Sequence, residues 1–154
     1  LTGSEYDDII YLDHTGDQGA DVVTGGEGSD VFVISDNGDN GGFDLIDDPS
    51  KVDMEQRLNV LLDNVNISHE QVTVAGVIDD FSVKNEGNND NLVLEGFSES
   101  SEHSVTVMED MAVVLIQEEE ESVEKFYTAA ILMPEYGSFD SSDMDLLNES
   151  IHKM

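Results

Sequence analysis

The chain has 154 residues, with 36 Asp and Glu against 5 Lys and Arg, which gives a formal net charge of −31 at pH 7. One domain is expected at this length, and the scarcity of positive charge excludes direct binding to nucleic acid or to an anionic membrane. Cysteine is absent, which excludes disulfides and thiolate metal sites. Such a charge density repels itself, so we expect the compact state to need bound cations or high salt. General adaptation to a salty habitat is the alternative explanation.

Neither the start of the chain nor its apolar runs indicate a leader or a membrane-spanning segment. It begins at Leu1 without a basic and apolar leader, so we expect a processed product or a fragment of a longer protein. No apolar run approaches the roughly 18 residues needed to cross a bilayer.

The first third of the chain is organised around glycine and aspartate. Nine of the 13 glycines lie within residues 3–42, and no Lys or Arg precedes Lys51. Such a clustering of glycine and aspartate is typical of short internal repeats. Aligning the aspartates gives three nine-residue units, at 3–11, 16–24 and 25–33.

The third unit has the pattern G-G-x-G-x-D-x-U-x at every defined position, where U is a large apolar residue. The second unit departs only at Asp17, and the first has Ser4 and Tyr6 where glycines are expected. This pattern resembles the calcium-binding repeat of the repeats-in-toxin, haemolysin-type family, over residues 3–46. The resemblance implies a parallel β-roll, in which each repeat supplies a six-residue turn and a three-residue strand, with Ca²⁺ between turns on the same side.

The residue types suit that ion. Glycine permits turn conformations that direct carbonyl oxygens inward, and Ca²⁺ takes about 6–8 oxygen ligands from carbonyls and carboxylates. By resemblance, the side-chain ligands are Asp8, Asp21 and Asp30, the turn carbonyls are those of Gly16, Gly19, Gly25, Glu27 and Gly28, and Asp44 comes from a strand typical of the end of such repeats. The alternative is a set of ordinary Gly-Asp turns without metal.

Three details refine this prediction. Ile10, Val23 and Phe32 occupy the U positions, so we expect them in the interior of the roll. Residues 12–15 interrupt the run, which predicts a displaced first turn. Residues 89–94 keep only the Asp and U positions of the repeat and are expected to form a degenerate later rung.

The remaining chain reads as short strands at 58–62, 72–78, 92–97, 104–108 and 111–117, rich in Val, Ile and Leu. Glu109-Asp110 is a candidate two-residue hairpin turn, and 126–133 is compatible with either a strand or a helix. In the tail 141–154, four apolar residues share one side of a helical wheel. That pattern predicts an amphipathic helix capped by Ser141, Ser142 or Asp143. The helix would dock on the core, act as a type I secretion signal, or bind a neighbouring subunit.

The predicted fold class is therefore all-β. A short parallel β-roll of calcium-binding repeats (1–48) is continued or capped by a β-sandwich-like region (49–140), and a short amphipathic helix ends the chain (141–154). We expect the region 49–140 to belong to the same domain as the repeats.

No catalytic motif is present: the sequence lacks H-E-x-x-H, G-x-S-x-G and a phosphate-binding glycine loop. We therefore expect no enzyme, but a calcium-dependent folding module of a secreted bacterial protein, extracellular or at the cell surface, with Ca²⁺ as its ligand. One alternative is a self-assembling fibre or adhesin subunit stabilised by calcium. A second is a carbohydrate-binding module of a secreted enzyme or a contact with extracellular matrix glycans, which the absence of Trp weakens.

Overall fold

A computed structural model describes residues 2–12, 19–35, 45–46, 52–67, 72–82, 89–95, 102–108, 111–118, 126–134, 139 and 141–153. The strands are β1 (Ile9–Leu12), β2 (Gly19–Val23), β3 (Val31–Ser35), β4 (Leu45–Ile46), β5 (Val72–Phe81), β6 (Asn91–Glu95), β7 (Glu102–Met108), β8 (Met111–Glu118), β9 (Phe126–Pro134) and β10 (Ile151–Lys153). The helices are α1 (Val52–Asn64), the 3₁₀ helix η3 (Ser141–Asp143) and α2 (Met144–Glu149). In this part of the chain no helix has the length and apolar character to span a membrane.

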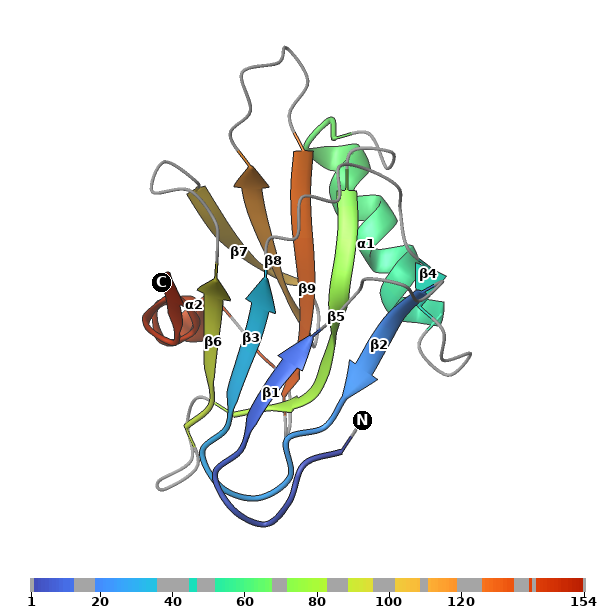
Figure 1. Cartoon of the computed structure of the whole chain (residues 1–154). Coiled ribbons are helices and arrows are strands. Elements are labelled where there is room, and N and C mark those ends of the chain that lie inside the picture. The colour runs from blue at the N-terminus through green and yellow to red at the C-terminus, as the bar shows by residue number, and fades with distance from the viewer. Residues whose placement is uncertain are drawn as a thin grey trace.

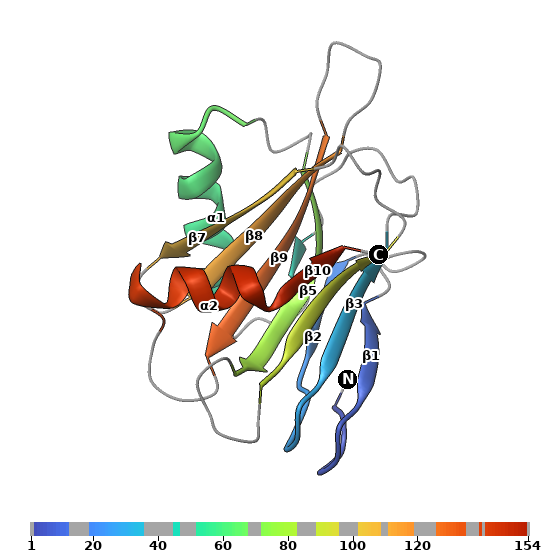
Figure 2. The ribbon, with the colours of Figure 1, turned by 90° about the vertical axis from the view of Figure 1, so that its left-hand side faces the viewer.

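The strands form two sheets that face each other (Figures 1 and 2). The four-stranded sheet has the order β1-β3-β6-β10 and is entirely parallel. The six-stranded sheet has the order β4-β2-β5-β9-β8-β7, parallel from β4 to β9 and antiparallel from β9 to β7. The strands β1, β2 and β3 fall alternately in the two sheets. The predicted predominance of β structure is confirmed, and α1 is an addition to it.

The registers confirm one repeat prediction and correct another. Ile9 pairs with Val31, and Val31 with Asn91, so 89–94 forms a later rung beside the third unit. The prediction of a displaced first turn was wrong, because β1 pairs in register with β3. Val31 follows Ile9 by 22 residues where two nine-residue units would give 18, so the four extra residues do not prevent this pairing.

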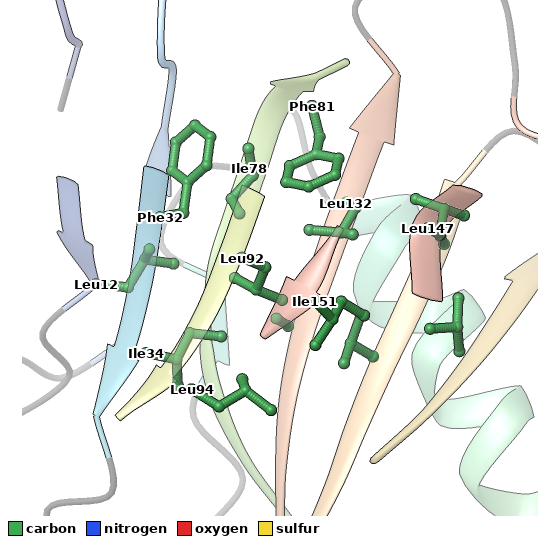
Figure 3. Close-up of a cluster of buried hydrophobic side chains, with 14 of the residues drawn as sticks. Leu12, Phe32, Ile34, Ile78, Phe81, Leu92, Leu94, Leu132, Leu147 and Ile151 are labelled. Atoms are coloured by element: carbon green, nitrogen blue, oxygen red, sulfur yellow. The ribbon is translucent and has the colours of Figure 1, made fainter. Parts of the chain in front are cut away.

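The main core lies between the sheets (Figure 3). Alternation along β1 turns Ile10 and Leu12 inward and leaves Ile9 and Tyr11 exposed. The three U-position residues Ile10, Val23 and Phe32 all lie in this core, as predicted. Leu92 and Leu94 of β6, Ile78 and Phe81 of β5, and Ile151 of β10 complete the centre of the cluster.

A second core covers the outer face of the six-stranded sheet. Leu58, Leu61 and Leu62 of α1 are buried against apolar residues of β5, β8 and β9. The predicted strand at 58–62 was therefore wrong. The i, i+3, i+4 spacing of these leucines makes one face of a helix, and the open sheet face supplies the apolar surface that this stripe needs.

Most of the C-terminal strands agree with the prediction from the sequence. β7 and β8 form the expected hairpin, in which Met108 pairs with Met111, and 126–133 lies in the strand β9. The tail forms a shorter helix than expected: α2 ends at Glu149, and Ile151 belongs to β10, which pairs with β6. Asp143 occupies the N-cap position of α2 without a side-chain capping bond. Figure 2 shows α2 beside β7 and leading into β10.

Candidate calcium site

The turns 3–8 and 25–30 lie side by side at one end of the two sheets (Figures 1 and 2). Backbone hydrogen bonds join them: Gly3 N donates to Thr24 O at 2.7 Å, and Glu27 N donates to Ser4 O at 3.1 Å. A side-chain bond adds to these, because Ser29 N donates to Asp7 Oδ1 at 2.8 Å. The first and third repeat units thus form neighbouring turns on the same side, as the repeat pattern predicted.

Glycine is required at two positions of the third unit. Gly26 and Gly28 have φ of 95° and 103°, a region that other residues rarely adopt. A Cβ on Gly26 would overlap the Ser4 carbonyl oxygen, and one on Gly28 would lie 2.8 Å from the Tyr6 carbonyl carbon. The repeat glycines therefore allow both the turn conformation and the close approach of the preceding turn.

The repeat aspartates form a ladder across three rungs. Asp8 N donates to Asp30 Oδ1 at 3.0 Å, and Asp30 N donates to Asp90 Oδ1 at 2.8 Å. The other oxygen of Asp90 accepts a bond from Ser82 N at 2.9 Å. Asp8 instead uses Oδ2 within its own turn, accepting from Ser4 N at 2.6 Å and from Ser4 Oγ at 2.9 Å. The carboxylates of Asp30 and Asp90 thus each accept a bond from the amide of the equivalent residue in the preceding rung.

Asp30 is the central member of the ladder and has an unsatisfied oxygen. Its side chain is fully buried, and Oδ2 has no hydrogen-bond partner within the described part of the chain. A Cβ built on Gly25 would overlap this oxygen, which places Oδ2 against the start of its own turn. Burial raises the pKa of Asp30 above its ordinary value, and the charges of Asp8, Asp80 and Asp7 raise it further.

A carboxylate from outside the repeats holds the start of the same turn. Gly25 N donates to Asp80 Oδ1 and Gly26 N to Asp80 Oδ2, both at 2.8 Å. Asp80 lies near the end of β5, 54 residues after Gly26. Both oxygens of one carboxylate therefore fix two successive amides.

The charged side chains that the structure describes around turn 25–30 are carboxylates. Asp7, Asp8, Asp30, Asp80 and Asp90 all contribute to the hydrogen bonds or the charge around turn 25–30. Burial raises the pKa of Asp90 to about 7, with further contributions from the charges of Asp30 and Asp80. Bringing these carboxylates together without a cation is therefore unfavourable at neutral pH.

The structure brings together some of the predicted ligands. Asp8, Asp30, Gly25, Glu27 and Gly28 lie in the two stacked turns. Gly19 and Asp21, expected in a turn, are in the strand β2, where their backbones pair with Leu45 and Gly76. That part of the prediction was wrong about local structure: β2 begins at Gly19, three residues before the expected start of the strand at Val22. Gly16 and Asp44 lie outside the described residues.

Two residues of this end were not among the predicted ligands. Asp90 occupies the Asp position of the degenerate rung, so the repeat pattern could have found it. Asp80 has no place in that pattern, and only the packing of β5 beside β2 brings it to the turn. Across the described residues, no three side chains of His, Asp or Glu are grouped to hold a metal. A cation here would therefore depend on backbone carbonyl oxygens as well as on carboxylates.

A separate cleft of about 200 Å³ lies between the end of α1 and the six-stranded sheet. Leu61 and Val65 line it from α1 and the residues that follow, Leu115 lines it from the sheet, and Gln117 and Tyr127 contribute polar groups. Tyr127 is the one Phe, Tyr or Trp ring among the lining residues that the structure describes, whereas sugar recognition usually relies on aromatic platforms. The cleft therefore gives little support to the glycan-binding alternative.

No protein-family model, no curated protein and no solved structure matches this chain.

Proposed function

We propose that this chain is a calcium-binding, calcium-dependent folding module of a secreted bacterial extracellular protein, without catalytic activity of its own. The observation that carries the proposal is the buried carboxylate of Asp30, whose Oδ2 has no partner in the described structure and lies in a glycine turn bordered by other carboxylates.

The cost of that arrangement favours a cation. A buried carboxylate oxygen without a partner costs several kcal/mol, and Asp7, Asp8 and Asp80 add repulsion to it. A hard divalent cation would remove both penalties. Asp30 Oδ2 together with carbonyl oxygens of turn 25–30, among them those of Gly25, Glu27 and Gly28, provides the oxygen chemistry that Ca²⁺ prefers.

Calcium would then act on the folding equilibrium. Without it, repulsion among the turns favours an expanded chain. With it, the binding free energy adds to the free energy of unfolding, because the ligands are assembled in the folded state alone. At the millimolar calcium of an extracellular medium, such a module would fold after export.

We also propose that the repeats and the strands beside them form a short calcium-binding β-roll. Strands β1, β2 and β3 alternate between the two sheets, and the turns before β1 and β3 lie in register. The rung at β6 extends the same stack with one Asp and one large apolar residue. These features support a roll of repeats that the later strands continue and cover.

The test is a calcium titration of chelated protein, followed by circular dichroism and light scattering. We expect a cooperative gain of strand signal with Ca²⁺ and a weaker response to Mg²⁺, which prefers smaller octahedral sites. Asp30→Asn should raise the calcium needed for half of the transition. Glu149→Gln, an exposed change on α2 that removes the same charge, should leave it unchanged. A chain that is fully folded in chelator and insensitive to calcium would contradict the proposal.

One observation favours assembly as a second function. Tyr6, Ile9 and Tyr11 are 70%, 67% and 61% exposed, and all three belong to the turn and strand at the edge of the four-stranded sheet. An exposed apolar edge strand is a template for pairing with another chain. Particle growth with calcium in the light-scattering channel, abolished by Ile9→Lys together with Tyr11→Lys, would support an assembling subunit. A constant particle size would exclude it under those conditions.

A further inference from the structure

One carboxylate from outside the repeats holds the first two amides of turn 25–30. The amides of Gly25 and Gly26 point to the two oxygens of Asp80, each at 2.8 Å. The carboxylate therefore satisfies N–H donors and is not available to the turn as one more acceptor. The peptide unit that contains Gly26 N also contains the carbonyl oxygen of Gly25, a group of the kind that a hard cation takes.

This contact fixes the peptide planes at the start of the turn. Gly26 has φ of 95°, and glycine at this position is intrinsically free to adopt other conformations. Two charge-assisted bonds to one carboxylate restrict that freedom. They also orient the peptide group between Gly25 and Gly26, and with it the carbonyl of Gly25.

We propose that Asp80 is a positioning residue for the calcium site. It does not bind the cation but holds turn 25–30 in the conformation that binds it. This inference rests on the proposed function. It has a consequence for calcium affinity, because residues that orient metal ligands typically change metal affinity by about 10–100-fold when they are replaced.

The choice of substitution follows from the geometry. Asp80→Asn keeps the size of the side chain, but its amide group presents one acceptor and one donor to two backbone donors, so one bond is lost and one donor faces another. Asp80→Glu retains two carboxylate acceptors on a longer stem. Glu149→Gln serves as the control for the loss of one negative charge far from the turn.

The experiment is isothermal titration calorimetry with calcium alone, beside circular dichroism at saturating calcium. We expect Asp80→Asn to raise the dissociation constant by about 10–100-fold, with the same number of bound ions and the same strand signal at saturation. Asp80→Glu should recover most of the affinity, and Glu149→Gln should match the parent. An affinity of Asp80→Asn equal to that of Glu149→Gln overturns the positioning role.

A measurement on the folded protein separates this inference from the proposed function. Amide hydrogen exchange at Gly25 and Gly26 is followed by NMR at saturating calcium, or in chelator if the chain proves to be folded without calcium, and reports whether Asp80 holds the turn. We expect exchange at both amides to be at least about tenfold faster in Asp80→Asn than in the parent. Equal rates overturn the inference. If the parent binds no calcium but the rates differ, the calcium function fails while the structural role of Asp80 stands.

Discussion

Acidification of the chelated protein provides the sharpest test of the carboxylate ladder. Asp90 is 2% exposed, and its two oxygens accept bonds from the amides of Asp30 and Ser82. Burial raises its pKa from 3.8 to about 7. A carboxyl that is harder to ionise in the folded state than in the unfolded state makes folding itself depend on pH.

The sign follows from counting protons. Between the unfolded pKa of 3.8 and the folded pKa of about 7, the unfolded chain has released this proton while the folded chain retains it. The protonated carboxyl of Asp90 therefore stabilises the folded chain fully below the unfolded pKa of 3.8, and this stabilisation is lost as the pH rises through the folded pKa of about 7. A difference of about three pKa units at 1.36 kcal/mol each corresponds to about 4 kcal/mol of unfolding free energy. The raised pKa of Asp30 acts in the same direction.

The assay is urea unfolding in chelator at a series of pH values, for the parent and for Asp90→Asn. The parent should become less stable as the pH rises toward neutrality, and the slope should be smaller in Asp90→Asn because the substituted group does not titrate. Comparing slopes, not absolute stabilities, removes the cost of the lost hydrogen bond. A parent and variant with equal slopes, or a parent that gains stability as the pH rises, would refute the reasoning. With calcium present the trend should reverse, because protonation of the ligands releases the metal.

Two further substitutions test other parts of the fold. Gly26→Ala should lower the unfolding free energy by at least about 1–2 kcal/mol, since φ is positive and the new Cβ meets the Ser4 carbonyl oxygen; an unchanged urea midpoint would contradict the turn geometry. Leu58→Ala should lower the unfolding free energy by about 2–5 kcal/mol because Leu58 is fully buried between α1 and the six-stranded sheet, whereas Val60→Ala on the exposed side of the same helix should stay within about 0.5 kcal/mol. Equal effects of these two variants in thermal unfolding would argue against the packing of α1.

The repeat region was predictable because its pattern constrains each position separately. Gly26 and Gly28 stand where the backbone needs positive φ, Asp30 stands where the ladder needs a carboxylate, and Phe32 fills the core. The same reasoning identified the rung at 89–94 from two positions alone, and the register with β3 confirms it.

The helix α1 was not predictable in the same way. Leu58, Leu61 and Leu62 fit a helix stripe and a short apolar strand almost equally well, since a run of five residues does not separate the two periods. Tertiary packing favours the helix, because the outer face of β5, β8 and β9 is apolar and the leucine stripe of α1 packs against it.

Asp80 illustrates a different limit of sequence reasoning. No local pattern links it to Gly25 and Gly26, because the contact is made by β5 pairing with β2 and ending beside the turn. Asp90 reaches Asp30 through the pairing of β6 with β3. Turn 25–30 is thus held by Asp80 from the six-stranded sheet and by Asp90, which directly precedes β6 of the four-stranded sheet. A cation bound in turn 25–30 would stabilise β5 and β6 together with the repeats, so calcium is expected to act on the folding of the whole module and not on its first third alone.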